Sequence, residues 1–248
     1  YTTLGMDTLR KRAAEAYAAG ARFAKWRNVL QIDPANGLPS DVAIQEATDQ
    51  LSKYALLCQA EGLVPIVEPE IVPNGQHDVY VCAAVTEKVL AAQFKSLLDH
   101  HVYLEGCVLK PNMVKNGLTG PKATPEEIAT LTITALKRTV PPALPGIFFL
   151  SGEMPLDVDN EEEATLNLNT MHQLYPSLPW HVSFSYGKAL QKTALVSWLG
   201  QAANVDKAQA ALLARASANS AAVRGTYVAG TCASVGLDGN IAQAAGPY

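Results

Sequence analysis

A regular alternation of short apolar runs with longer stretches of helical periodicity restricts the fold of this chain more than any other feature. The apolar runs predict five strands, at residues 22–30, 63–71, 103–110, 146–150 and 180–187. Helices are predicted at residues 8–19, 41–59, 79–100, 125–138, 164–170, 188–199 and 205–220, with an acidic loop at 153–163. Strands that alternate with helices in this way form a parallel sheet with helices packed around it.

Residues that cap helices or interrupt strands support these boundaries. Asp7, Ser40 and Thr124 each stand just before a helical pattern, where a side-chain oxygen can accept a hydrogen bond from the first turn. Pro65 and Pro69 fall within the second apolar run, and proline is awkward inside a paired strand. We therefore expect these prolines to mark a strand end where the backbone turns toward a site.

The composition describes a globular protein and excludes some classes of partner. The chain has 248 residues, of which 48% are hydrophobic and 17% charged, and its net charge is −4. This length accommodates one large α/β domain with a sizeable core. Since acidic and basic residues are mixed along the chain, we expect no general binding of nucleic acid or anionic membranes. No run approaches the roughly 20 apolar residues of a membrane span.

The cysteines and histidines show no metal-binding pattern. The 4 cysteines are widely separated, and the 5 histidines have no ligand spacing. We therefore predict reduced thiols, no metal site and no cofactor.

Polar residues gather where successive predicted strands end. In chain order they are Lys25 and Arg27, Glu68 and Glu70, Lys110, Ser151 and Gly152, and then Ser185, Tyr186 and Gly187. The carboxyl ends of parallel strands share one edge of a sheet, and ligands usually bind there. Repetition on five successive strands is the pattern of a barrel whose carboxyl rim holds an active site.

Lys110 is the most informative of these residues. It is either a solvated cation at a strand exit or a partly buried amine that acts as a nucleophile. Burial, or a second cation such as Lys25, favours the neutral amine, which attacks a ketone to form an imine. Glu68 and Glu70 are candidates for the proton transfers that imine formation needs, although paired carboxylates beside prolines are also common in solvated loops.

Two glycine-containing turns are candidates for phosphate binding. Ser151 and Gly152 form one of them, and Gly187 with Lys188 forms the other. Many barrels bind phosphate between their last two loops, where backbone N–H groups and a cation hold the anion. Turns of this kind also occur without a ligand, so both interpretations stay open.

Several longer motifs resemble class I fructose-1,6-bisphosphate aldolases, from residue 1 to about 227. They are GLVPIVEPE at 62–70, VTEKVLA at 85–91, LEGCVLKPNMV at 104–114, RTVPP at 138–142, FLSG at 149–152, EEEATLNLN at 161–169 and FSYG at 184–187. The resemblance implies a (β/α)8 TIM barrel, of which this chain supplies about five strands. It also implies a metal-free lyase that reversibly cleaves fructose 1,6-bisphosphate to dihydroxyacetone phosphate and glyceraldehyde 3-phosphate through a lysine Schiff base.

The resemblance assigns roles to individual residues. Lys110 matches the Schiff-base lysine, Glu68 the general acid and base of carbinolamine dehydration, and Glu70 its neighbour. Lys25 and Arg27 match a basic pair near the imine and the substrate.

Further matches concern the phosphate and the end of the chain. The phosphate-binding and substrate-binding positions of the family correspond to Ser151, Gly152, Ser185, Tyr186, Gly187 and Lys188. Tyr248 matches a C-terminal tyrosine that assists proton exchange. Glu153 replaces a second glycine of the family, and residues 154–160 form an insert. Lys188 replaces an arginine, which keeps the charge and loses bidentate geometry.

The family's chain begins earlier and includes three further barrel strands. We therefore expect this sequence to be the C-terminal two-thirds of an aldolase, with residues 1–224 in the barrel and 225–248 a mobile tail. Imine formation is expected of this chain, and complete aldol cleavage is not. The family also implies a homotetramer and a cytoplasmic protein, with a plastid location as the other option. One alternative is a non-catalytic fragment that binds sugar phosphates or proteins, and another is a different imine-forming barrel enzyme.

Overall fold

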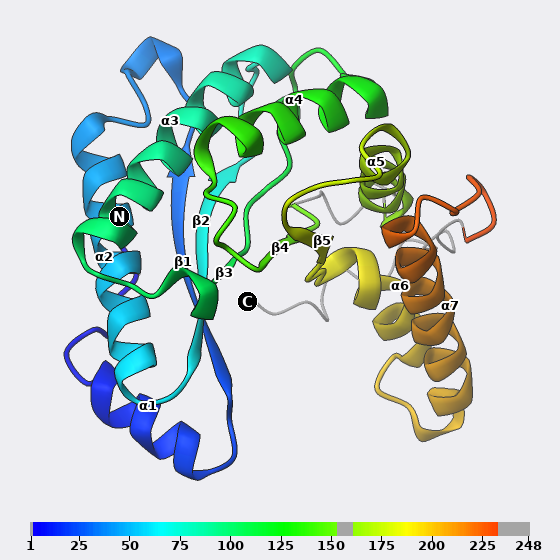
Figure 1. Cartoon of the computed structure of the whole chain (residues 1–248). Helices are drawn as coiled ribbons and strands as arrows, with labels where there is room; N and C mark the ends of the chain where they lie inside the picture. The colour runs from blue at the N-terminus through cyan, green and yellow to red at the C-terminus, as the bar shows by residue number, and fades with distance from the viewer. Residues whose placement is uncertain (1, 153–160, 233–248) are drawn as a thin grey trace. The chain divides into compact units, whose positions relative to one another are not determined.

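The structure is a computed structural model that describes residues 2–152 and 161–232, in which strands alternate with helices (Figure 1). The elements are, in chain order, α1 (Leu9–Ala18), β1 (Phe23–Gln31), η1 (Pro34–Asn36), α2 (Asp41–Ala60), β2 (Val64–Val72), α3 (Val79–Asp99), η2 (Leu104–Gly106), β3 (Val108–Leu109), α4 (Pro125–Thr139), β4 (Gly146–Phe149), α5 (Glu161–Leu174), β5 (His181–Phe184), α6 (Lys188–Trp198), η3 (Ala202–Asn204) and α7 (Val205–Val223). The strands form one sheet in the order β1-β2-β3-β4-β5, in which β1 and β2, β2 and β3, and β3 and β4 pair in parallel. The predicted parallel α/β fold is confirmed.

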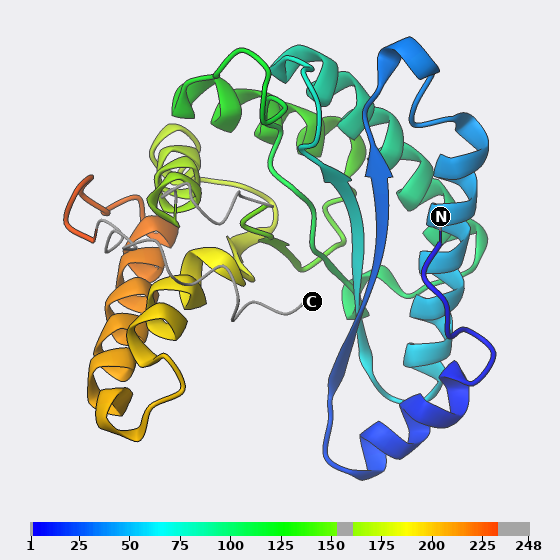
Figure 2. The same ribbon diagram turned by 180° about the vertical axis from the view of Figure 1, so that it is seen from behind.

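The chain divides into two compact units, Tyr1–Phe149 with Leu178–Ser183, and Leu150–Ser177 with Phe184–Tyr248. In the first unit α2 packs on β1 and β2, α3 packs on α2 and β2, and α4 packs on α3, as Figure 1 and Figure 2 show from opposite sides. In the second unit α5, α6 and α7 pack on one another. No helix among the described residues is long and apolar enough to cross a membrane.

The two faces of β1 carry different kinds of side chain, as the period of two along a strand requires. Trp26 and Asn28 are buried on the helix side, where Asn28 Nδ2 donates to the carbonyl of Ala47 in α2 at 3.1 Å. Lys25 and Arg27 project from the opposite face. The helix-covered face is therefore the core of this unit, and the other face is left for polar chemistry.

Two of the three predicted capping residues, Ser40 and Thr124, cap their helices. Ser40 Oγ accepts from the first turn of α2, and Thr124 with Glu127 forms a reciprocal capping box at α4. The first helix differs from the prediction, because its N-cap is Thr8 and not Asp7, and no side chain caps it.

Pro65 and Pro69 lie inside β2, so the prediction that they mark a strand end is wrong. The carbonyl of Val67 accepts from the N–H of Lys110 at 2.8 Å, on the side of β3. Because backbone polar groups alternate in direction along a strand, the two prolines also have their missing N–H on the β3 side. Neither proline costs a hydrogen bond to β1, and β2 therefore pairs with β1 along its full length.

The strand that leads to Lys110 is shorter than predicted, since β3 has 2 residues and η2 precedes it. In a regular parallel ladder the N–H of residue 69 would donate to the carbonyl of Lys110, but Pro69 has no N–H. Pro111 also lacks a donor. The side chain of Asn112 then accepts from the N–H of Ile71 at 2.9 Å, in place of a main-chain carbonyl. The ladder therefore ends at Lys110.

A glutamine from α2 explains why η2 is not part of that strand. Gln59 Nε2 donates to the carbonyls of Tyr103, at 2.7 Å, and Gly106, at 3.2 Å. Gln59 Oε1 accepts from the N–H of Tyr103 at 3.0 Å. These backbone groups are satisfied by a side chain, so they need no neighbouring strand.

The second unit departs from prediction at its start and near its end. Helix α5 begins at Glu161, although residues 153–163 were predicted to be a loop; acidic residues suit a helix N-terminal turn because of the helix dipole. Residues 225–232, assigned to the tail, form a turn packed on α5. In this turn Tyr227 is buried, and its hydroxyl donates to Glu162 Oε1 at 2.6 Å.

Candidate active site

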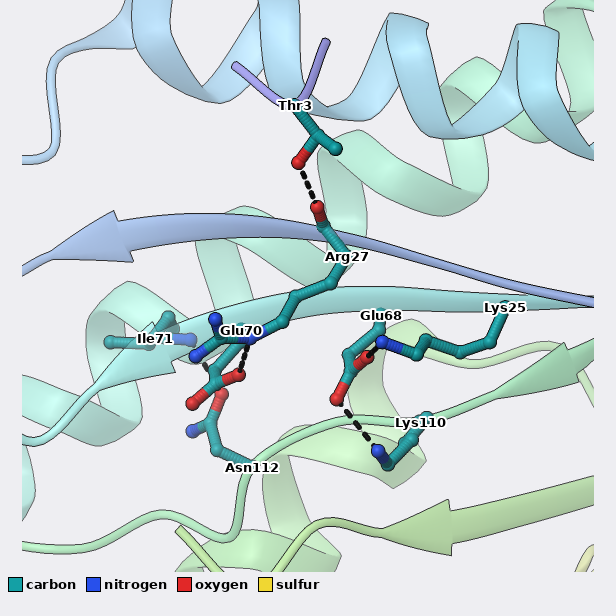
Figure 3. Close-up of polar contacts among 8 residues, drawn as sticks. All are labelled: Thr3, Lys25, Arg27, Glu68, Glu70, Ile71, Lys110 and Asn112. Carbon is teal, nitrogen blue, oxygen red and sulfur yellow. Dashed lines mark hydrogen bonds and ion pairs between the residues drawn. The ribbon is translucent and has the colours of Figure 1, made fainter. Parts of the chain in front are cut away.

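The register of the sheet brings the predicted basic and acidic residues of three strands to one face. Arg27 lies opposite Glu68, and Val67 lies opposite Leu109, the residue before Lys110. Continuing that register by one residue places Lys110 opposite Glu68, on the face that also carries Lys25. Figure 3 shows both lysine side chains directed at Glu68.

Glu68 lies between two ammonium groups. Its Oε1 is 2.8 Å from Lys110 Nζ, and its Oε2 is 3.0 Å from Lys25 Nζ. The Glu68 side chain is 3% exposed and that of Lys110 15%, whereas that of Lys25 is 43% exposed. Lys25 was expected to act on Lys110 by repulsion between two cations. Instead, a buried carboxylate bridges them, so each ammonium has a nearby negative charge.

The two oxygens of Glu68 are not equivalent. Oε2 is buried and forms an ion pair with Lys25, without a well-aligned hydrogen bond in the described part of the chain. Oε1 lies within proton-transfer distance of Lys110 Nζ. One carboxylate therefore contacts the candidate nucleophile with one oxygen and Lys25 with the other.

Glu70 contacts a different basic residue. Its Oε2 accepts from Arg27 Nε, and its side chain is buried (Figure 3). The carbonyl of Arg27 in turn accepts from the hydroxyl of Thr3. Both carboxylates of the β2 strand are thus engaged with basic groups, but Glu68 is the one that reaches Lys110.

Asn112 supports this site, and the sequence analysis did not identify it. Its Oδ1 accepts a hydrogen bond from the N–H of Ile71, the residue after Glu70, and its Nδ2 donates to the carbonyl of Met113 at 3.1 Å. The side chain therefore ties the end of β2 to the segment that leaves Lys110. Its position directly after Lys110-Pro111 was the available signal, because an amide beside a proline can replace a missing ladder bond.

The second unit contains the predicted phosphate turns. Ser151 is buried, and its Oγ accepts from the N–H of Ala189, in the first turn of α6, at 3.5 Å. Gly187 is the N-cap of α6 and Lys188 its first residue. Gly152 has φ +83°, a left-handed conformation that favours glycine. A Cβ at Gly152 or Gly187 would meet no described heavy atom within 4 Å. The structure thus brings both turns to the start of α6.

The remaining predicted residues of this unit have different surroundings. Ser185 is exposed. Tyr186 is buried, and its hydroxyl donates to the carbonyl of Ala164 at 2.9 Å. Burial raises the pKa of Tyr186 far above its ordinary value. Tyr186 is therefore a packing residue of the α5 and α6 core. Tyr248, Glu153 and residues 154–160 lie outside the described residues.

The described residues contain no group of three or more histidine, cysteine or acidic side chains that would hold a metal ion. Cys58, Cys82 and Cys107 are buried free thiols, and burial raises the pKa of each.

A parallel α/β sheet with a lysine at the end of β3 in contact with a carboxylate on β2 defines a barrel-type α/β protein with a lysine-centred site. The family model described as "Glycolytic: Fructose-bisphosphate aldolase class-I" matches residues 1–244. The chain belongs to the class I fructose-bisphosphate aldolase family.

Individual relatives agree with that family. The chain is 56% identical over 229 residues to fructose-bisphosphate aldolase 5, cytosolic, of Arabidopsis thaliana, covering 92% of this chain and 62% of that protein. Fructose-bisphosphate aldolase 1 of Toxoplasma gondii is also 56% identical, with 92% of this chain and 61% of that protein covered. The chain thus spans 61–62% of the length of these curated relatives.

A solved structure is similar as well. It is fructose-bisphosphate aldolase from Plasmodium falciparum in complex with TRAP and a small-molecule inhibitor. The TM-score is 0.88 at 51% sequence identity, and the match covers 92% of this chain and 65% of that one. The sheet and helices described above are therefore part of an aldolase barrel.

Proposed function

We propose that this chain carries the imine-forming part of a class I fructose-1,6-bisphosphate aldolase site, with Lys110 as the nucleophile. The observation that supports it most is the 2.8 Å contact between Lys110 Nζ and Glu68 Oε1 at the end of β3. A partly buried lysine beside a buried carboxylate has a base for its proton and limited access to bulk water. The whole protein would reversibly cleave fructose 1,6-bisphosphate to dihydroxyacetone phosphate and glyceraldehyde 3-phosphate.

Imine formation proceeds by proton exchange between Lys110 and Glu68. Glu68 takes a proton from the ammonium, and the neutral amine of Lys110 attacks the ketone carbon of the substrate to give a carbinolamine. Protonated Glu68 then donates to the carbinolamine hydroxyl, which leaves as water, and the C–N bond becomes an iminium. Glu68 ends as a carboxylate, and the positive charge is now on the iminium. Oε1, which is 2.8 Å from Lys110 Nζ, is the oxygen placed to exchange these protons.

The other residues of the site bind and orient the substrate. Lys25 is partly exposed, and it keeps a positive charge beside Glu68 while the proton moves between Glu68 and Lys110. Arg27 is held by Glu70, which fixes its guanidinium near the substrate face of β2. We propose that the turn of Ser151, Gly152, Gly187 and Lys188 binds a phosphate group, with N–H groups of the first turn of α6 as donors.

Three assignments from the family complete the proposal. Tyr248 would assist proton exchange at the ketose carbon, and the whole protein would be a homotetramer. Relatives named cytosolic or cytoplasmic, including the isozyme of Spinacia oleracea, support a cytosolic location.

Borohydride trapping tests the proposal. The chain is incubated with dihydroxyacetone phosphate and sodium borohydride, and peptide mass spectrometry locates the reduced adduct. We expect the adduct on Lys110 and none in K110R, while K95R, a control at an exposed lysine paired with Asp99, traps normally. Folded wild-type chain without an adduct would reject the enzymatic proposal. Binding of fructose 1,6-bisphosphate without an adduct would favour a non-catalytic sugar-phosphate module.

A further inference from the structure

Arg215 in α7 is fully buried, although an isolated arginine side chain is among the least favourable groups to bury. Its guanidinium donates four hydrogen bonds. Nε donates to the carbonyl of Ala189 at 2.9 Å, and Nη1 to that of Cys232 at 2.9 Å. Nη2 donates to the carbonyl of Glu161 at 2.8 Å and to Thr165 Oγ1 at 2.7 Å.

All four of these acceptors are neutral oxygens. The nearby carboxylate of Glu161 is itself buried, and it accepts from the N–H of Thr193 at 3.0 Å and from the Thr193 hydroxyl. Within the described residues, the charge of Arg215 is therefore stabilised by carbonyl and hydroxyl dipoles, without a direct carboxylate partner. Buried ionic groups can often be replaced by apolar residues at no loss of stability, so stability alone does not account for a buried charge here.

The contacts of Arg215 converge on the first turn of α6. The carbonyl of Ala189 accepts from Arg215 Nε and also from Asn219 Nδ2 at 3.4 Å. The N–H of the same residue faces Ser151 Oγ. Ala189 is thus held by α7 on its carbonyl side and by the Ser151 turn on its N–H side. The guanidinium therefore contacts the same turn of α6 whose N–H groups are the candidate phosphate donors.

We propose that Arg215 is a positioning residue for phosphate binding. It fixes the peptide groups of the first turn of α6 in the orientation that receives the anion, and its charge adds to the positive end of that helix. This inference rests on the proposed phosphate-binding role of the Ser151 and Gly187 turns. It assigns a function to a residue of α7 that need not touch the substrate.

Measuring the phosphate affinity of the folded protein distinguishes a positioning role of Arg215 from a purely structural one. A residue that only stabilises the fold would change the fraction of folded protein, and the folded fraction would bind phosphate normally. A positioning residue changes the affinity of the folded protein. Arg224, exposed at the C-cap of α7, offers a control with the same change of charge.

The experiment is a titration of the 15N-labelled chain with inorganic phosphate at constant ionic strength, followed by amide chemical shifts. In the wild type we expect saturable shifts at Gly152, Lys188 and Ala189. R215M should raise the dissociation constant more than about tenfold, because a hydrogen bond from a charged group is lost. R215K keeps the charge but cannot donate the same four hydrogen bonds, so its dissociation constant should be intermediate. R224M should bind phosphate with the affinity of the wild type.

The outcomes distinguish this inference from the proposal it rests on. No phosphate response in the wild type would reject the phosphate-binding role of the turn. A wild-type response with folded R215M or R215K binding within twofold of it would overturn the inference alone. If neither variant folds, the Nε–H signal of Arg215 in the wild type decides: it must shift during the titration, and a constant signal would overturn the inference.

Discussion

Replacing Glu68 with glutamine is the sharpest test of how the site operates. E68Q keeps the shape of the side chain and removes the negative charge between Lys25 and Lys110. Lys25 is 43% exposed, so its ion pair contributes at most about 1 kcal/mol to stability. Lys110 and Glu68 are much less exposed, and a charge-assisted contact of this kind contributes roughly 1.5–3 kcal/mol. We therefore expect E68Q to lower the free energy of unfolding by about 1.5–4 kcal/mol in total.

The effect on chemistry should be larger than the effect on stability. Glutamine neither takes the proton of Lys110 nor returns it to the carbinolamine hydroxyl. Loss of a general acid and base typically slows a reaction about 10²–10⁴-fold. The assay is the rate of borohydride-trapped adduct at Lys110 with dihydroxyacetone phosphate, measured beside urea unfolding of the same samples.

A matched control removes a carboxylate elsewhere in the same unit. Glu87 pairs with Arg138 at 2.7 Å on the surface, where both side chains are more exposed than Glu68. E87Q should change stability by less than about 1 kcal/mol and leave trapping unchanged. Trapping by E68Q at the wild-type rate would refute the assignment of Glu68 as the proton carrier.

Three further predictions concern other residues of the first unit. N112A should lower the free energy of unfolding by about 1–3 kcal/mol in urea, because the N–H of Ile71 loses its acceptor, whereas N112D keeps an accepting oxygen and loses less. T124A should lower it by about 1 kcal/mol by removing the cap of α4. Burial lowers the pKa of His77 below 6.5, so the unfolded chain binds more protons. Stability should therefore fall as the pH drops below 6.5, and H77F should lose that part of the pH dependence.

Each of these predictions has a result that would contradict it. Equal stability of N112A and the wild type would show that water replaces the amide at no cost. T124A without effect would mean that the exposed capping box contributes nothing to α4. A wild-type pH profile retained in H77F would assign the titration to other groups, since both ring nitrogens of His77 are buried and without partners among the described residues.

The sequence predicted the fold better than it predicted the contacts. The alternation of strands and helices followed from local periodicity, and Ser40 and Thr124 defined two helix starts because capping is local. Lys25, Glu68 and Lys110 were all expected at strand ends. Lys110 does follow the end of β3, but Lys25 and Glu68 lie within β1 and β2, and the three residues meet because they share one face. The bridging position of Glu68 was not predictable, because it depends on the register of three strands.

Two of the errors arose because the structure of a segment depends on a distant part of the chain. Pro69 was predicted to mark a strand end because the sequence of one strand does not show which neighbouring strand, β1 or β3, its missing N–H would face. The predicted strand at 103–110 failed because Gln59 of α2 satisfies its first residues. Arg215 gave little signal, since a single arginine in an alanine-rich helix is usually a surface residue.

The missing N–H of Pro69 has a consequence for anyone transplanting this site into another scaffold. If only Lys110 and Glu68 were copied onto a regular parallel sheet, the strand that carries the glutamate would have a backbone N–H at the position of Pro69. That N–H would donate to the carbonyl of the lysine. The strand that carries the lysine would then stay paired with the middle strand beyond the lysine, whereas here the pairing ends there. A graft must therefore include the proline of the neighbouring strand and the asparagine that replaces the lost bond, although neither residue takes part in the chemistry.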